Sequence, residues 1–291
     1  MSSPPNADAG SQFGNEGTLE GEGGVSLVTR SWEPTLPGAA MVVIVHGLKD
    51  HSARYDPLAR ALTAAGVSVY AFDLRGHGRS GGVRAHVDRF ADYLADLDRV
   101  VRSLRARRPT GPIFLLGHSM GGAIALGYLL TGELRFDGLI LTGPAIAPPP
   151  SAGVFARAIT RLLSALRPKA RVFDLKDEAF SRDAETVAAL QSDPYVFHGK
   201  ATARLAAELL HRMAQSRVQL DRVDLPLLIL HGSADRLTDP KGSELLLAQS
   251  RSRDKRLKVY PGWYHDLLHE PGRQEVVNEI SEWLAIRLPA A

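Results

Sequence analysis

The chain contains no cysteine among its 291 residues. Disulfide bonds, thiolate metal sites and cysteine nucleophiles are therefore excluded, while the redox state of the compartment stays open. The sequence also lacks an apolar run long enough to span a membrane. Its first 24 residues have neither the basic n-region nor the apolar h-region of a signal peptide. We therefore predict a cytoplasmic protein.

The chain has almost no excess of charge of one sign. It contains 35 Lys and Arg and 32 Asp and Glu, which gives a net charge of +3. A nucleic-acid-binding protein normally concentrates basic residues in a stripe. The densest basic segment, RVVRSLRARR at residues 99–108, has the apolar spacing of a helix with a solvated basic face. We therefore expect no nucleic-acid partner.

Short apolar runs alternate with longer segments of helical spacing along most of the chain. Several of the short runs are continuous Val, Ile and Leu, which is typical of strands buried on both faces of a parallel sheet. This alternation predicts an α/β fold, with a mostly parallel central sheet flanked by helices. The expected strands are Val25–Ser31, Met41–His46, Val67–Phe72, Ile113–Gly117, Gly138–Thr142, Pro226–His231 and Leu257–Tyr260. The expected helices are Ala53–Ala65, Val87–Arg107, Ser119–Thr131, Ala201–Ser216, Pro240–Gln249 and Pro271–Leu288.

Composition divides the chain into four segments. Residues 1–24 are rich in Gly, Ser, Pro and Asn, and we expect them to form a disordered tail. The strand–helix alternation of residues 25–145 is interrupted by a proline-rich opening and resumes in residues 220–291. We therefore predict one α/β core made of these two parts, with residues 146–219 inserted as a mainly helical cap.

The segment GHSMG at residues 117–121 carries the clearest chemical signal. It places Ser119 between an apolar strand and a helix, in a Gly-x-Ser-x-Gly pattern. The glycines leave room for a strained turn that exposes the hydroxyl, and the following helix directs its N-terminal amides at the same place. We predict Ser119 as a nucleophile. The alternative is a tight glycine turn in which the serine only caps the helix.

A serine nucleophile needs a base and an acid that orients the base. In the α/β-hydrolase arrangement of this motif the order along the chain is serine, acid, histidine. His265 follows the last expected strand and is predicted as the base, whereas His269 is expected to be a surface or cap-contact residue. Asp235 follows the preceding strand and is predicted as the acid. Asp239, just before a proline, is expected to cap the next helix.

The developing oxyanion requires two donors. One is expected to be the amide of Met120, directly after the serine. The other is expected to be the amide of Leu48, which follows His46-Gly47 at the end of an early strand. The alternative for His46-Gly47 is a plain turn with a satisfied histidine.

Taken together, these residues resemble the α/β-hydrolase superfamily, and more closely the monoacylglycerol lipases. The resemblance runs from about residue 25 to the C-terminus. It is carried by the segments VIVHGLKDHSARY, AFDLRGHGRSGG, FLLGHSMGGAIAL, SDP, LHGSADRLTDPKGSELL and YPGWYHDLLHEP. It implies that Ser119, Asp235 and His265 form the catalytic triad.

The resemblance also implies an activity. The expected enzyme cleaves carboxylic esters of lipids through an acyl-enzyme, converting monoacylglycerol into a fatty acid and glycerol without metal or organic cofactor. A broader carboxylesterase or a lysophospholipase with the same triad is the first alternative. Epoxide and dehalogenating hydrolases use an aspartate nucleophile, so the serine at position 119 argues against these two classes. A non-catalytic binding protein on this fold would be expected to lack a triad member, and none is missing.

Two segments depart from the family pattern. The first loop usually reads His-Gly-x-Gly-Glu-His, whereas here Lys49 replaces a glycine and Asp50 replaces the glutamate. Asp50 and Arg54 are expected to form an ion pair. Before the SDP segment the chain has Leu190-Gln191, where relatives often carry a tyrosine-containing pair. The residues expected to bind substrate are Gly47, Asp50, Arg54 and Leu190.

The predicted cap opens with an amphipathic segment at residues 152–173. Its apolar residues share one helical face, with Arg157, Arg161 and Arg167 elsewhere around the helix. One interpretation is that the apolar face packs on the core. The other is that it lines an acyl-chain entrance and makes transient contact with a lipid surface. The sequence does not indicate an oligomeric state.

Overall fold

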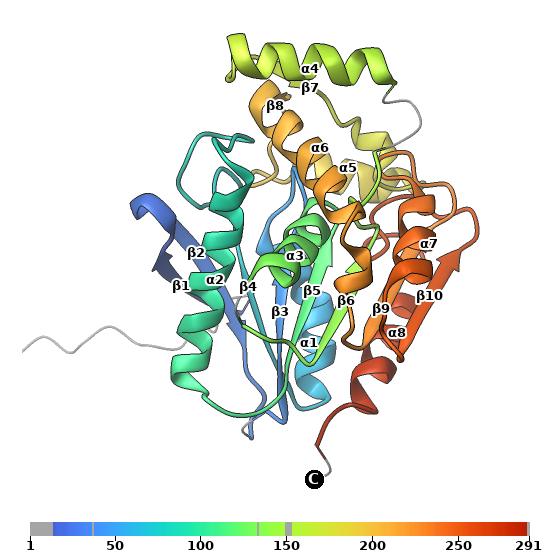
Figure 1. Ribbon diagram of the computed structural model, residues 1–291. Coiled ribbons are helices and arrows are strands. Elements are labelled where there is room, and N and C mark those ends of the chain that lie inside the picture. Colours follow the sequence, from blue (N-terminus) through green and yellow to red (C-terminus); the bar gives the residue numbers. More distant parts are fainter. Residues whose placement is uncertain (1–13, 37, 133, 149–152, 290–291) are drawn as a thin grey trace, which may run out of the picture.

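An eight-stranded sheet organises the computed structural model, which describes residues 14–289 apart from residues 37, 133 and 149–152. The strand order is β1-β2-β4-β3-β5-β6-β9-β10, and all neighbours from β4 to β10 are parallel (Figure 1). The predicted α/β fold is confirmed. The strands are β1 Asn15–Glu20, β2 Ser26–Trp32, β3 Ala40–Val45, β4 Val67–Phe72, β5 Ile113–His118, β6 Gly138–Thr142, β9 Leu227–Gly232 and β10 Lys255–Tyr260.

The five central strands, β4, β3, β5, β6 and β9, are buried at every residue. Their continuous Val, Ile and Leu runs fit this position, because helices cover both faces of a parallel sheet. One face packs on α1 (Asp56–Ala64), which follows the short 3-10 helix η2 (Ser52–Tyr55), and on α8 (Gln274–Ala285). The other face packs on α2 (Phe90–Arg107), α3 (Met120–Thr131) and α7 (Pro240–Gln249).

The N-terminal segment corrects one expectation. Residues 15–20, which we expected in a disordered tail, form β1 and pair antiparallel with β2, and a 3-10 helix, η1, follows at Glu22–Gly24. The side chains of β1 are mostly exposed, so no apolar pattern marks the strand. Backbone pairing and the ion pair of Glu16 with buried Arg30 (2.8 Å) hold it at the sheet edge. Residues 1–13 of the expected tail lie outside the described residues.

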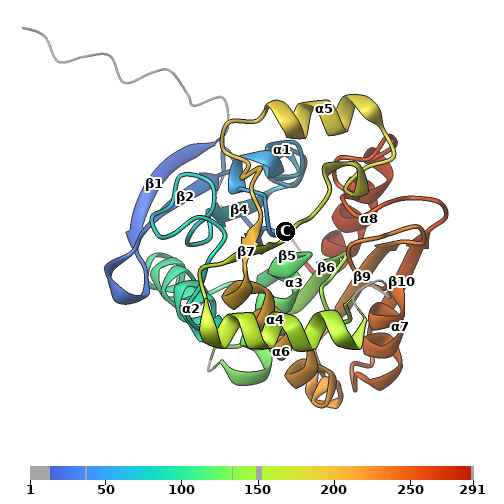
Figure 2. The same ribbon diagram turned by 90° about the horizontal axis from the view of Figure 1, so that it is seen from above.

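The segment between β6 and β9 lies above the carboxyl ends of the central strands (Figure 1). Seen from above, α4 and α5 lie on different sides of these strand ends, and α4 crosses α6 (Figure 2). We keep the name cap for residues 146–219, of which 149–152 are outside the described residues. Its elements are α4 Val154–Leu166, β7 Arg171–Phe173, η3 Asp177–Ala179, α5 Ala184–Ser192, β8 Ala201–Thr202 and α6 Ala203–Arg217, and η4 Leu220–Arg222 leads back to the sheet.

Candidate active site

Ser119 stands at the tight turn between β5 and α3. Its backbone has φ 53° and ψ −119°, a strained conformation for a residue with a side chain. Backbone hydrogen bonds hold it there. The Ser119 amide donates to Thr142 O (3.0 Å), and its carbonyl oxygen accepts from the amides of Gly122 (2.9 Å) and Ala145 (3.0 Å). The surrounding sheet and helix therefore fix the turn predicted from the sequence.

The glycine after this turn is required by close packing. A Cβ at Gly121 would lie 2.0 Å from the carbonyl oxygen of Val45 in β3. A Cβ at Gly117, before the turn, would lie 2.6 Å from Gly121 O. No side chain fits at either distance, so the helix can approach the sheet this closely only with glycine at both positions.

The structure brings the predicted base and acid together from two loops. His265 follows β10 and Asp235 follows β9, and the His265 Nδ1 atom lies 2.6 Å from Asp235 Oδ2. Both side chains are buried. The other carboxylate oxygen accepts from the amides of Leu237 (2.7 Å) and Thr238 (3.0 Å). The acid is therefore held in one orientation by its own loop.

Electrostatics favour a charged acid and a basic imidazole. Burial raises the pKa of Asp235, but the nearby imidazoles of His265 and His231 outweigh it and leave the pKa well below its usual range. Burial lowers the pKa of His265, but the carboxylate of Asp235 outweighs it and raises the pKa above 6.5. Such an imidazole can take up a proton and keep it stabilised while a reaction proceeds.

The Nε2 atom of His265 is free to act on a hydroxyl group. It is buried and has no hydrogen-bond partner among the described residues. The ring lies between Phe180 (centroids 5.8 Å apart) and His118 (4.9 Å), the residue that precedes Ser119. Burial and the proximity of His265 lower the pKa of His118 to about 4, so His118 is neutral near pH 7 and adds no competing charge.

A second histidine beside the acid was missed by the sequence argument. His231, at the end of β9, is fully buried, and its Nε2 atom lies 3.1 Å from Asp235 Oδ2. Its Nδ1 atom lies 2.7 Å from Ser243 Oγ in α7. The only available sequence signal was its place four residues before the predicted acid, at the carboxyl end of a buried strand.

Ser119 opens into a cavity of about 590 Å³, within the range of small-ligand pockets. Leu48 and Met120, whose amides were predicted as oxyanion donors, both line it. Most of the remaining wall is apolar and comes from the cap. The cap residues include Ala156 and Thr160 of α4, Phe173 of β7, and Leu209, Leu210 and Met213 of α6.

None of the four predicted substrate contacts is among the residues that line this cavity. Asp50 is buried, accepts from Tyr55 Oη (2.8 Å) and pairs with Arg54 (2.9 Å), as expected for that ion pair. Arg54 also pairs with Asp266 (2.7 Å). Leu190, in α5 of the cap, is buried and belongs to the larger apolar cluster of the protein. Asp50 and Arg54 hold neighbouring loops together through these contacts, and their role in substrate binding stays a prediction, as does that of Leu190.

Gly47, the fourth predicted contact, lies beside Ser119. A Cβ at this position would come within 3.0 Å of Ser119 Cβ. The absence of a side chain therefore keeps the space around the serine open. His46, just before it, uses both ring nitrogens, with Nδ1 2.8 Å from Gly47 O and Nε2 accepting from the Leu74 amide (2.9 Å).

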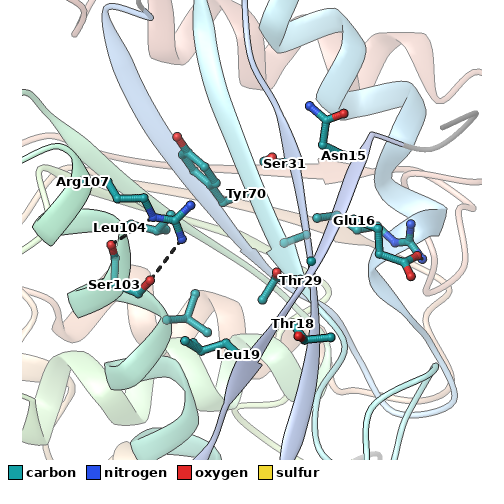
Figure 3. Close-up of a pocket in the computed structure, with 14 residues that line it drawn as sticks. Asn15, Glu16, Thr18, Leu19, Thr29, Ser31, Tyr70, Ser103, Leu104 and Arg107 are labelled. Atoms are coloured by element: carbon teal, nitrogen blue, oxygen red, sulfur yellow. Dashed lines mark hydrogen bonds and ion pairs between the residues drawn. The ribbon is translucent and has the colours of Figure 1, made fainter. Parts of the chain in front are cut away.

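A second cavity, of about 250 Å³, lies between the β1–β2 edge of the sheet and α2 (Figure 3). Arg107 and Ser103 from α2, whose side chains are hydrogen-bonded, face Thr18 and Thr29 across it. Its described lining contains neither histidine nor aspartate, so it has no counterpart of the His265–Asp235 pair. Within the described part of the chain, no cluster of three histidine or acidic side chains is placed to hold a metal ion.

Comparison with known proteins points to one enzyme family. The family model for serine aminopeptidase S33 matches residues 37–272. Monoacylglycerol lipase of Mycolicibacterium smegmatis is 37% identical over 94% of this chain and 98% of its own. Monoglyceride lipase of Homo sapiens is 35% identical over 92% of this chain and 89% of its own. A solved structure of a soluble variant of monoglyceride lipase from Saccharomyces cerevisiae, in complex with a substrate analogue, has a TM-score of 0.87 at 26% identity and covers 99% of this chain and 100% of that one.

Proposed function

The chain belongs to the serine aminopeptidase S33 family and, within it, to the monoacylglycerol lipases of the α/β-hydrolase superfamily, and on this basis we propose that it hydrolyses monoacylglycerol to a fatty acid and glycerol. The observation that carries the proposal is the His265–Asp235 pair, at 2.6 Å, behind a cavity into which Ser119 opens. Its apolar lining favours a lipid over a polar ester.

The reaction that this arrangement supports has two steps. Ser119 Oγ attacks the ester carbonyl carbon while His265 Nε2 takes the hydroxyl proton. The amides of Leu48 and Met120 donate to the oxyanion of the tetrahedral intermediate. The C–O bond to glycerol then breaks, and the leaving oxygen takes the proton from His265.

The second step releases the acid. Water attacks the acyl-enzyme and gives a proton to His265 Nε2, and the second tetrahedral intermediate collapses. The fatty acid leaves as Ser119 Oγ recovers its proton. Throughout, the carboxylate of Asp235 holds the imidazole in one tautomer and stabilises its charged form.

The cavity provides the binding free energy for the acyl chain. Each methylene group transferred from water contributes about 0.8 kcal/mol, so a ten-carbon chain contributes several kcal/mol even after the cost of ordering it. Binding free energy from this remote part of the substrate can also raise turnover. Long acyl chains are therefore expected to be better substrates than acetate esters.

We further propose that α4 rests on a lipid surface during catalysis. One interpretation of the sequence was that the apolar face of α4 packs on the core. In the structure this face is exposed instead. Phe155 is 79% exposed, Leu162 59% and Leu166 71%. The opposite side of the same helix lines the cavity through Ala156, Arg157 and Thr160. An apolar surface beside the entrance suits an enzyme whose substrate resides in membranes or micelles.

Among the described residues, no helix combines the length and the apolar character that crossing a membrane requires. The proposed contact is therefore peripheral, and the cytoplasmic location remains a prediction. Three other substrate classes fit the same residues. A lysophospholipid or a simple aryl ester would use the same nucleophile and base, as would the aminoacyl amide bond that the family name serine aminopeptidase indicates.

A substrate panel with the Ser119→Ala variant tests the proposal. Wild-type protein is expected to hydrolyse monoacylglycerol faster than lysophospholipid, aryl acetate or aminoacyl arylamide. The alanine variant should lose activity by about a millionfold, as in other serine hydrolases stripped of the nucleophile. A fluorophosphonate should label the wild-type protein and not the alanine variant. Such labelling distinguishes an enzyme with an activated serine from a binding protein. Equal turnover in both proteins, or no preference for the glycerol ester, contradicts the proposal.

A further inference from the structure

Lys49 occupies a position that is unfavourable for a lysine. It directly follows Leu48, and its φ of 62° lies in the left-handed region, which favours glycine. The side chain is only 4% exposed. A buried ammonium group is costly unless it is fully paired. Both features require compensating contacts elsewhere in the fold.

The compensating contacts come from the cap. Lys49 Nζ lies 2.7 Å from Asp177 Oδ1 and donates to the carbonyl oxygen of Leu175 at 2.9 Å. Both partners belong to residues 174–180, which we call the cap strap. Asp177 is itself mostly buried. The ion pair therefore joins the loop that carries the expected oxyanion donor to a segment more than a hundred residues away.

The cap strap also forms part of the wall of the cavity that contains Ser119. Leu175, Glu178 and Ala179 line this cavity, and so does Leu48, the residue directly before Lys49. The last residue of the strap contacts the loop that follows β10 and carries His265. There the carbonyl oxygen of Phe180 accepts from the amide of Asp266 (2.8 Å), and the Phe180 ring contacts His265.

We propose that Lys49 is a positioning residue that holds the cap strap at a fixed distance from the oxyanion loop and thereby determines selectivity among acyl-chain lengths. The inference rests on the proposed function of the cavity. The contacts of Lys49 with Leu175 and Asp177 fix the first half of the strap, and the Phe180–Asp266 hydrogen bond fixes its last residue. A short acyl group does not fill the cavity, whereas a long one uses the whole wall.

The test compares Lys49→Met and Asp177→Asn with the wild type on a butyrate and a laurate ester of the same phenol. Both variants are expected to lower kcat/KM for laurate about tenfold, mainly through KM, and to leave kcat for butyrate within about twofold. The double variant should be no worse than Lys49→Met, because the two residues act through one contact. Lys241→Met, at an exposed lysine of α7, is the matched control and should leave both substrates unchanged.

Folding is monitored separately. Lys49→Gly removes the ion pair and relieves the left-handed strain together, so its Tm should exceed that of Lys49→Met, while its laurate-to-butyrate ratio falls equally. If Lys49→Met does not fold, Asp177→Asn carries the test, because it keeps the lysine and its bond to Leu175 O.

An unchanged laurate-to-butyrate ratio in folded variants overturns the inference, as does an equal loss on both esters. Failure of wild-type protein to cleave either ester would instead refute the proposed function.

Discussion

His231 and Asp235 are joined by a buried contact of 3.1 Å between Nε2 and Oδ2, the same carboxylate oxygen that lies 2.6 Å from His265 Nδ1. One carboxylate oxygen of Asp235 therefore contacts two imidazole rings. Because Asp235 accepts, His231 carries its proton on Nε2, and Ser243 Oγ donates to Nδ1 at 2.7 Å. If His265 is the base, as proposed, His231 is expected to orient it indirectly through Asp235.

Replacement of His231 is expected to weaken catalysis without removing a reacting group. His231→Leu deprives Asp235 of a donor, and hydrogen bonds to charged groups contribute about 1.5–3 kcal/mol. We expect kcat to fall about tenfold or more and the acidic limb of the pH profile to move upward, because the carboxylate becomes more basic. His231→Gln, which offers an amide donor, should recover part of the loss. Equal defects in both variants, with an unchanged pH profile, would indicate a packing role only.

The pH dependence of activity follows from the raised pKa of His265. In the proposed mechanism the imidazole must be neutral to accept the proton of Ser119, so kcat/KM should fall as the pH drops through the pKa of His265. That limb is expected above pH 6.5, the ordinary value for histidine, because Asp235 raises the pKa. Steady-state kinetics on a soluble ester across pH 5 to 9 will locate the limb. A limb below pH 6.5 would contradict this assignment.

Asp235→Asn supplies the matching variant. It removes the charge that raises the pKa of His265 and leaves burial, which lowers it. The acidic limb should therefore move to lower pH, and kcat should fall about ten-thousandfold because the tautomer is lost. Residual turnover with an unmoved limb would mean that another group controls the profile.

The exposed apolar face of α4 is expected to bind lipid surfaces. The double variant Phe155→Ser/Leu166→Ser should reduce binding to vesicles of equimolar phosphatidylcholine and phosphatidylglycerol at least about tenfold, since each apolar side chain contributes about 1.5–3 kcal/mol on burial. Activity on a soluble short ester should persist. Ile286→Ser, at a residue 79% exposed after the end of α8, serves as control. Co-sedimentation with vesicles measures the effect, and undiminished binding of the double variant refutes it.

Close packing at the nucleophile turn predicts a loss of stability. Gly121→Ala would put a methyl group 2.0 Å from Val45 O, and we expect a cost of about 3 kcal/mol or more and a Tm lowered by at least about 5 °C. Gly153→Ala has open space around its Cβ and should change the Tm little. Thermal unfolding followed by circular dichroism compares the two. Similar Tm values would mean that α3 can shift away from β3 at low cost.

The sequence predicted the core of the fold because its signals there are local. Continuous apolar runs marked the buried strands, and the observed β4 and β6 have the predicted bounds. The edge strand β1 was missed because its side chains are mostly exposed and its stability comes from pairing with β2. The further partners of Asp50 and Arg54 were missed for a related reason, since Tyr55 and Asp266 are identified only in the folded chain.

The amino-acid sequence by itself determined the strand–helix alternation and the serine turn, because neighbouring residues and backbone geometry decide both. Only the tertiary structure decided that His231 contacts the carboxylate of Asp235, that Lys49 forms an ion pair with the cap and that the apolar face of α4 points away from the core. The first depends on how the loop after β9 folds back on its strand, the second joins groups that are far apart along the chain, and the third depends on how a whole helix is turned. Burial and pairing in three dimensions select them, and no local pattern of residues encodes that selection.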